Sequence, residues 1–413
     1  MVRIAAVAVG LGCVGWIAGT GGQTAPPGQT KVLRFARLWD GTRVIPDAVV
    51  VVSGNLIVSV TSGKVATPPG AETIDLGRYT GLPGLIDAHT HITYFWDGAP
   101  GTTPFKQPAR EPAERVRLAE ANGRRTLETG VTTVRDLGAS GGTDIAMRDL
   151  INSGQMVGPR LFVSGQGISA GRGGAPDVET VRKTTDTRLG TTADWIKVYA
   201  SRGSYQSVDT TQTIEYAALA AIVEAAHAKG RKVAIHSYGP SGVKDAVRAG
   251  ADSIEHGIDL DDETLAEMVK RRTVWVPTVD HNRYYVDAKD EFQFAPESIP
   301  PLLAYIEKNL ESVRRAFKAG VRIAMGSDAV YSMFGQNTCE LGWFVKAGMT
   351  PEQALRTATT TGAELLGQEK RLGRIAPGYL ADIIAVEGNP LTRIDDLFTG
   401  VRWVMKDGNV VRR

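Results

Sequence analysis

The sequence Gly-Leu-Ile-Asp-Ala-His-Thr-His, residues 84–91, decides how the rest of the chain is interpreted. Its apolar start after a Pro-Gly pair indicates a short strand that enters a hydrophobic core. Because side chains alternate between the two faces of a strand, His89 and His91 point the same way and can bind one metal ion. Two histidines on a solvated edge are the alternative. This solvated-edge alternative is less favoured, because two others of the chain's six histidines also end apolar runs.

Three more polar residues end strand-like runs. His236 ends Lys-Val-Ala-Ile-His, His256 ends Asp-Ser-Ile-Glu-His, and Asp328 ends Val-Arg-Ile-Ala-Met-Gly-Ser-Asp. In a parallel α/β barrel the C-terminal ends of the strands meet at one face, where active sites lie. Histidine and aspartate are common metal ligands. Together with His89 and His91, these residues predict a metal site at that face.

The middle of the chain alternates between strand-like and helical segments. The strand-like runs are 85–89, 132–137, 160–164, 195–199, 233–237, 253–255, 274–278 and 322–325. Helical patterns such as 112–129 and 214–229 lie between them and stop at glycine. Alternation alone would equally suit an open, doubly wound sheet. The metal ligands therefore decide for an α/β fold with a (β/α)8 TIM barrel over residues 84–373.

Both ends of the chain are rich in short β-type runs separated by turns. Residues 31–80 contain several such runs, and residues 381–411 contain two more, with Asp407-Gly408 as a hairpin signal. We expect residues 30–83 and 374–413 to form one small β-sandwich domain.

The first 25 residues differ from the rest. A positive Arg3 is followed by an apolar stretch, residues 4–18, and then by a polar break. This stretch is short for a membrane span, which needs about 20 residues. We expect residues 1–25 to be a cleaved signal peptide and the enzyme to be exported, periplasmic or secreted, without stable membrane insertion. An uncleaved anchor is the alternative.

Composition restricts the class of partner. The net charge is +2, apolar residues make up 42% and charged residues 22%, as in an ordinary globular protein. No Lys/Arg cluster indicates a nucleic-acid footprint. We expect a small-molecule substrate and no nucleic-acid partner.

The motifs together resemble the amidohydrolase superfamily, and most closely its branch of Xaa-Pro dipeptidases, imidazolonepropionases, prolidase-like carboxypeptidases and ochratoxin-hydrolysing amidases. Beyond 84–91, they are Trp-Ile-Lys-Val-Tyr at 195–199, Ile-His-Ser-Tyr-Gly at 235–239, Ser-Ile-Glu-His-Gly at 253–257 and Gly-Ser-Asp at 326–328. The closing Leu-Gly-Arg-Ile-Ala-Pro-Gly, residues 372–378, also matches the return from barrel to sandwich. The resemblance implies a homo-oligomer.

The resemblance also implies a site for two divalent metal ions, best suited to Zn²⁺, with cobalt or manganese as substitutes. His89, His91 and Asp328 would bind the more buried ion, and His236 and His256 the second. Lys197, carboxylated on its amine, would bridge them. An unmodified ammonium beside two cations would be strongly disfavoured, whereas a carbamate supplies negative oxygens. A solvent-facing Lys197 is the alternative, but an unpaired lysine is rare in a strand with this apolar pattern.

Metal coordination lowers the pKa of water from ~15.7 to about 7, so that a nucleophile is available near neutral pH. Asp328 is the predicted catalytic residue, because a carboxylate beside the reacting atoms can carry the proton to the leaving amine. The predicted reaction is hydrolysis of an amide bond in dipeptides or N-acyl amino acids, including ochratoxin-type amides as a side reaction. Hydrolysis or deamination of a cyclic amide or amidine is the alternative. Relatives with that activity commonly use one metal and no bridging lysine.

The predicted substrate contacts are less specific. Tyr238 shares the face of His236 if the strand continues, which places a phenol beside the site. His281 and Arg283 follow the seventh strand in a segment that we expect to form a loop at the mouth of the barrel, suited to a free carboxylate. Relatives often have a Gly-Gly-His-Gly loop after strand three. Here Arg172 lies in the matching Gly-Arg-Gly-Gly, so the role of that histidine is absent or has passed to Arg172.

Overall fold

The computed structural model describes residues 30–171, 174–203 and 209–412. The expected signal peptide, residues 1–25, and Arg172 lie outside the described residues.

Parallel strands form where all eight strand-like runs were predicted. They are β6 (Leu85–Thr90), β7 (Val131–Asp136), β8 (Arg160–Val163), β10 (Trp195–Tyr199), β11 (Lys232–His236), β12 (Ser253–Glu255), β13 (Val274–Val276) and β14 (Arg322–Ile323). They belong to two parallel sheets, β6-β7-β8 and β14-β13-β12-β11-β10-β9, in which β9 is Ile168–Ser169. Most of their residues are buried, which explains why most of these runs are rich in apolar residues.

Backbone hydrogen bonds join the first strand to the segment after the last. Thr90 of β6 forms a parallel bridge with Ala329, and the Asp328 amide donates to the His89 carbonyl oxygen over 2.7 Å. At the other junction, the Asp194 amide, just before β10, donates to the Val163 carbonyl oxygen of β8 over 2.8 Å. The C-terminal end of β6 and the segment that follows β14 therefore lie side by side.

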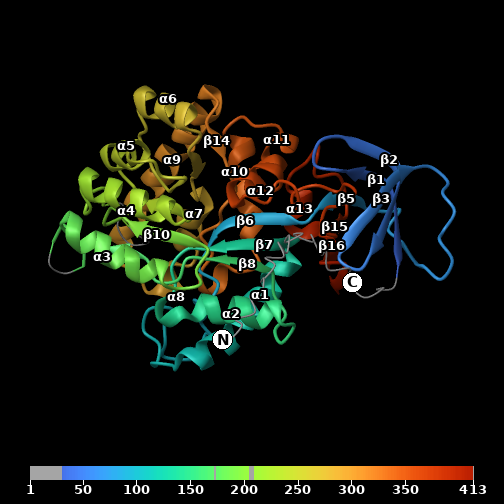
Figure 1. The fold of residues 1–413 in the computed structure, drawn as a ribbon, viewed down its shortest axis with the longest axis horizontal. Helices are drawn as coiled ribbons and strands as arrows, with labels where there is room; N and C mark the ends of the chain where they lie inside the picture. Colours follow the sequence, from blue (N-terminus) through green and yellow to red (C-terminus); the bar gives the residue numbers. More distant parts are fainter. Residues whose placement is uncertain (1–29, 172–173, 204–208, 413) are drawn as a thin grey trace, which may run out of the picture.

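Helices follow the strands and lie outside them (Figure 1). The longer ones are α1 (Pro112–Glu128), α2 (Thr143–Asn152), α3 (Val178–Leu189), α4 (Tyr216–Ala228), α5 (Pro240–Ala249), α6 (Asp262–Arg271), α7 (Val279–Asp287) and α9 (Ile299–Ala319). Shorter ones are α8 (Lys289–Phe292), α10 (Glu340–Lys346), α11 (Pro351–Thr357), α12 (Thr360–Leu366) and α13 (Asp396–Gly400). Among the described helices, none is both long and apolar enough to cross a membrane.

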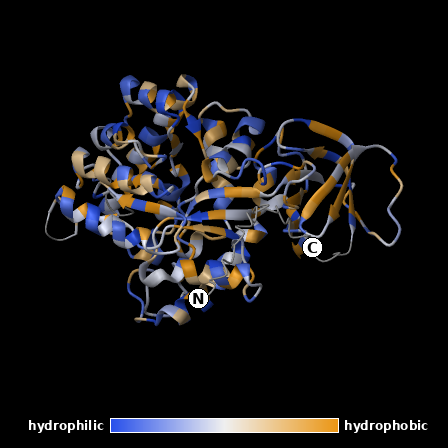
Figure 2. Ribbon diagram, viewed as in Figure 1, coloured by the Kyte–Doolittle hydropathy of each residue, from blue (hydrophilic) through white to orange (hydrophobic). Residues whose placement is uncertain are grey.

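Strands from both ends of the chain form a third, mostly antiparallel sheet. They are β1 (Lys31–Trp39), β2 (Val44–Ser53), β3 (Leu56–Ser62), β4 (Glu72–Asp75), β5 (Thr80–Pro83), β15 (Ile383–Val386), β16 (Val401–Lys406) and β17 (Asn409–Arg412). β5 pairs with β15 in antiparallel register, which joins the two termini (Figure 1). Figure 2 shows hydrophobic residues concentrated on strands of both regions. The chain is thus an α/β protein with a smaller β unit.

Candidate metal centre

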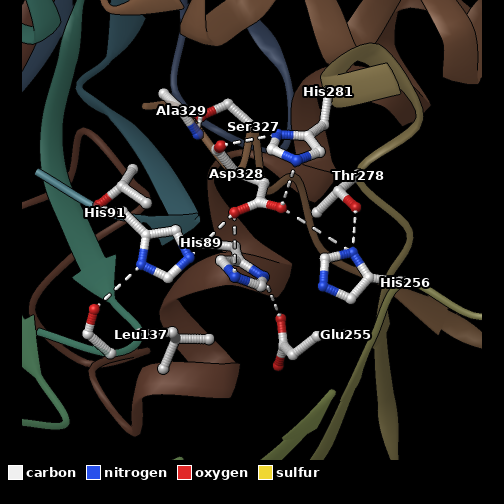
Figure 3. Close-up of polar contacts among 12 residues, drawn as sticks. His89, His91, Leu137, Glu255, His256, Thr278, His281, Ser327, Asp328 and Ala329 are labelled. Atoms are coloured by element: carbon white, nitrogen blue, oxygen red, sulfur yellow. Dashed lines mark hydrogen bonds and ion pairs between the residues drawn. The ribbon is translucent and has the colours of Figure 1, made fainter. Parts of the chain in front are cut away.

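Asp328 lies at the centre of a ring of imidazoles (Figure 3). Its Oδ1 is 3.2 Å from His91 Nε2 and 3.4 Å from His89 Nε2, and its Oδ2 is 3.1 Å from His281 Nε2 and 4.0 Å from His256 Nδ1. Ligand atoms of His89, His91 and Asp328 all lie within 4.8 Å of one another. His89 of β6 and His91, directly after this strand, thus converge on one carboxylate.

The donor atoms of this cluster suit a cation. His89 Nε2 and Asp328 Oδ1 are buried and make no hydrogen bond. Burial lowers the pKa of His89 to about 4, so its imidazole is neutral at pH 7 and presents a lone pair. Burial raises the pKa of Asp328, but the nearby histidines outweigh this effect and hold it well below its usual range. A neutral imidazole beside a carboxylate is a ligand set that divalent metals prefer.

His236 and His256 form a second group next to the first. Their ring centroids are 4.5 Å apart, and those of His256 and His89 are 5.2 Å apart. Burial lowers the pKa of His236 to about 3 and that of His256 well below its usual value. Both rings are therefore neutral at pH 7 and free to act as ligands. The structure brings both predicted pairs of histidines to one place.

Lys197 of β10 lines the same cavity as these histidines. Its side chain is 1% exposed, and Nζ makes no hydrogen bond. Nζ lies 5.1 Å from the centre of the Tyr199 ring. Burial lowers the pKa of Lys197 to about 8, against the opposing effect of Glu255 and Asp328. The solvent-facing alternative for Lys197 does not hold.

Unusual backbone conformations cluster at this site. His256, Thr278 and Asp328 have positive φ angles of 66°, 50° and 53°. Residues other than glycine rarely adopt such angles, and those that do cluster at functional sites. Nearby, a Cβ atom on Gly326 would collide with His89. The Gly-Ser-Asp motif therefore lets the Asp328 turn approach β6 closely.

Sequence reasoning missed the residues that orient the ligands. His89 Nδ1 lies 2.9 Å from Glu255 Oε2, and Arg135 Nη2 donates to Glu255 Oε1 over 2.9 Å. His256 Nδ1 lies 2.7 Å from Thr278 Oγ1. Partners of this kind set the tautomer and orientation of metal-binding histidines. An available signal was Glu255, a carboxylate in a short, fully buried strand directly before His256.

A model of the amidohydrolase family matches residues 80–411. The chain belongs to the amidohydrolase family. Members of this family are hydrolases that typically bind metal, so the chain is a hydrolase, and its His-His-Asp cluster is a group of side chains that could hold a metal ion.

Individual relatives of this amidohydrolase agree with the branch predicted from the motifs. An ochratoxinase from Aspergillus niger is 31% identical over 354 residues, which cover 76% of this chain and 71% of that protein. A solved structure of a Xaa-Pro dipeptidase with methionine bound in its active site is 32% identical, with a TM-score of 0.84, covering 93% of this chain and 100% of the other. An imidazolonepropionase from Kosmotoga olearia is 22% identical over 411 residues, 86% of this chain and 91% of its own.

The candidate metal ligands of this amidohydrolase line a cavity of ≈ 180 Å³. Tyr238, a predicted substrate contact, also lines it and stacks on His256 with centroids 4.8 Å apart. His281 lines it as well and contacts Asp328 directly. Tyr94, Phe105, Tyr285 and Tyr331 add aromatic walls.

Arg283 is placed away from this cavity. The segment expected as a loop is helix α7, so Arg283 lies one turn from Asp280 and one turn from Asp287. Its guanidinium pairs with both oxygens of Asp280 at 2.9 and 2.8 Å and with Asp287 at 2.7 Å. A substrate carboxylate could reach it only by breaking these pairs. The loop expectation was therefore wrong, and the Arg283 guanidinium is already paired with two carboxylates of its own helix.

Proposed function

We propose that this amidohydrolase hydrolyses an amide bond in dipeptides or N-acyl amino acids, with ochratoxin-type amides as a side activity. The observation that carries the proposal is Lys197, buried and without a hydrogen bond beside two pairs of histidines. A cyclic-amide hydrolase with one metal would not need a bridging ligand at this position. In the same proposal, the eight parallel strands close into a (β/α)8 barrel.

The proposed ligands follow from the two groups of side chains. His89, His91 and Asp328 would hold one divalent ion, and His236 and His256 a second. Lys197 would bridge the ions after carboxylation. Only a neutral amine can attack carbon dioxide, and a pKa of about 8 makes the neutral form far more available at Lys197 than at an ordinary lysine. When bound, the ions would polarise the substrate carbonyl and make a nucleophile available near neutral pH.

Asp328 would carry the proton. Its low pKa keeps the carboxylate ionised, so it can accept a proton from the attacking water and pass it to the leaving amine. His281 Nδ1 lies 2.9 Å from the Asp328 carbonyl oxygen, which only accepts, so Nδ1 must donate there. His281 Nε2 therefore has a lone pair facing Asp328 Oδ2. A proton held by Asp328 can be shared between these two atoms.

Substrate recognition would rest on the cavity walls. The aromatic rings of Phe105 and Tyr285 suit an apolar side chain, and the small cavity suits a short substrate. The Tyr238 hydroxyl would bind the free α-carboxylate of the released amino acid. Arg283 is left out of this assignment because it is paired within α7.

The proposal is tested by metal analysis combined with a substrate panel. Xaa-Pro, Xaa-Arg, N-acetyl-phenylalanine and a cyclic imide would be incubated with metal-loaded enzyme. We expect about two divalent ions per chain and turnover of dipeptides or the N-acyl amino acid. One ion per chain together with turnover of only the cyclic imide would replace the proposal with the cyclic-amide alternative.

We also propose that the enzyme is exported after cleavage within the first residues and assembles as a homo-oligomer. The composition of residues 1–25 supports export. Intact mass and cell fractionation test the first point, and light scattering tests the second. A full-length cytoplasmic monomer would contradict both.

A further inference from the structure

A second, larger cavity of ≈ 520 Å³ lies next to the metal cavity. Tyr94 and Tyr331 line both, so these two side chains stand between them. Their rings are 5.9 Å apart, and the Tyr331 amide donates to the Tyr94 carbonyl oxygen over 3.0 Å. Tyr94 in turn stacks on His91 with centroids 4.9 Å apart. The second cavity is therefore separated from a proposed metal ligand by one aromatic ring.

The position of the second cavity indicates which part of the substrate would face it. Figure 3 places His91 and His256 on opposite sides of Asp328. Tyr238 stacks on His256, whereas Tyr94 stacks on His91. If Tyr238 binds the α-carboxylate on the amine side of the scissile bond, the acyl side points past His91 toward the second cavity. This step rests on the proposed function.

The charged residues that line the second cavity are both arginines, Arg110 and Arg115. Arg110 is neutralised by Asp97 at 2.7 Å and Glu114 at 3.5 Å. Arg115 donates to Ser140 Oγ over 2.9 Å, and its guanidinium forms no ion pair with a carboxylate of the described ranges. The Arg115 guanidinium thus keeps an unneutralised positive charge and N–H donors that can bind a ligand.

We propose that this cavity binds the acyl part of the substrate and that Arg115 anchors an anionic group on it. A planar guanidinium with free donors matches a carboxylate in bidentate geometry. Polar groups from Thr93, Gln107 and Ser140 complete a lining suited to such a ligand. The preferred substrates are amides whose acyl chain ends in a carboxylate.

The test uses matched substrates. N-succinyl-, N-glutaryl- and N-adipyl-L-phenylalanine are compared with the same compounds in which the terminal carboxylate is a primary amide. For at least one chain length, we expect kcat/KM of the wild-type holoenzyme to favour the acid by about tenfold or more, mainly through KM. Arg115→Gln should reduce this ratio to about one, and Arg115→Lys should retain part of it.

Arg117→Gln is the matched control, because Arg117 lies on the same helix, is exposed and does not line the cavity. It makes the same change in net charge and should keep the wild-type ratio. A ratio near one in the wild type, or an equal fall in both variants, would overturn the inference.

Failure of the proposed function is distinguishable from failure of this inference. Wild-type enzyme that hydrolyses no N-acyl-phenylalanine contradicts the function. Calorimetric binding of the acids and amides to the metal-loaded wild-type protein, which by that result does not turn them over, then tests the cavity. Preference for the acid that Arg115→Gln abolishes supports the inference, and equal binding of acid and amide, or binding of neither, overturns it.

Discussion

Glu255 Oε2 lies 2.9 Å from His89 Nδ1, although the two residues are 166 positions apart in the chain. Burial would raise the pKa of Glu255, but Arg135 and His89 outweigh it and lower the pKa to about 2. Both side chains are fully buried. An ionised Glu255 accepts from Nδ1–H, which leaves Nε2 of His89 directed at Asp328 as a lone pair.

Glu255→Gln should weaken metal binding. The amide fills the same volume but removes the charge that fixes the His89 tautomer, and loss of such partners typically costs 10–100-fold in metal affinity or activity. Metal titration of the apo-protein measures the affinity. Glu263→Gln, on the exposed first turn of α6, should leave it unchanged. Equal affinities of Glu255→Gln and wild type would show that His89 does not depend on this bond.

Lys197→Ala should lose metal and most activity. The substitution removes the proposed bridge, and adding excess zinc should restore activity only in part. Metal content by mass spectrometry and turnover are measured together, with Lys244→Ala as a control because Lys244 pairs on the surface with Asp261 and Glu263. A single tightly bound ion in active wild type, with Lys197→Ala unaffected, would refute the bridging role.

Most of the strand order and the residues that meet in the candidate metal centre could be predicted from sequence. The parallel strands are largely buried, so most of them appear as short runs rich in apolar residues. His89 and His91 obey the two-residue repeat of a strand, which is a local rule. Asp328 was predicted because its run also ends at the C-terminal face.

Other features could not be predicted from local sequence patterns. They depend on contacts between residues that are distant in sequence, or on a helix that was not expected. The Glu255–His89 and Arg135–Glu255 pairs join separate strands, so no local pattern reveals them. Arg283 was expected to face substrate from a loop. In the helical period of α7 it lies beside Asp280 instead. His281 lies beside Asp328 because it belongs to the same helix, which was expected to be a loop.

Asp328→Asn should lower kcat by about 10²–10⁴-fold, because removing positioned acid-base help typically costs this much. The amide cannot accept the proton that the ionised carboxylate takes. Steady-state kinetics and metal content are compared with Asp287→Asn, an exposed change on α7. Near-normal turnover with metal bound would exclude Asp328 as the proton carrier.

Glu340→Gln should change how stability depends on pH. Glu340 accepts from the amides of Val279 and Asp280 at the start of α7, and burial raises its pKa well above the usual value. The folded state therefore holds a proton that the unfolded state releases above its ordinary pKa. The contribution of Glu340 to the free energy of unfolding is complete below about pH 4.5. It is lost as pH rises above that value, and the free energy of unfolding then falls by at most about 1.4 kcal/mol per pH unit.

Urea unfolding between pH 5 and 8 compares the two proteins. The difference in unfolding free energy, wild type minus Glu340→Gln, should decrease with rising pH. A difference that is constant with pH would mean that Glu340 is ionised throughout this range.

Tyr238→Phe tests which group of the substrate the phenol binds. If it anchors the α-carboxylate, kcat/KM for dipeptides should fall much more than for the same compounds with an amidated C-terminus, because a hydrogen bond to a charged group contributes roughly 1.5–3 kcal/mol. The stack on His256 is preserved, since phenylalanine retains the ring. Equal losses on acid and amidated substrates would assign Tyr238 to the oxyanion that develops on the scissile carbonyl. A wild-type enzyme that prefers amidated substrates would contradict the carboxypeptidase assignment itself and favour the cyclic-amide alternative.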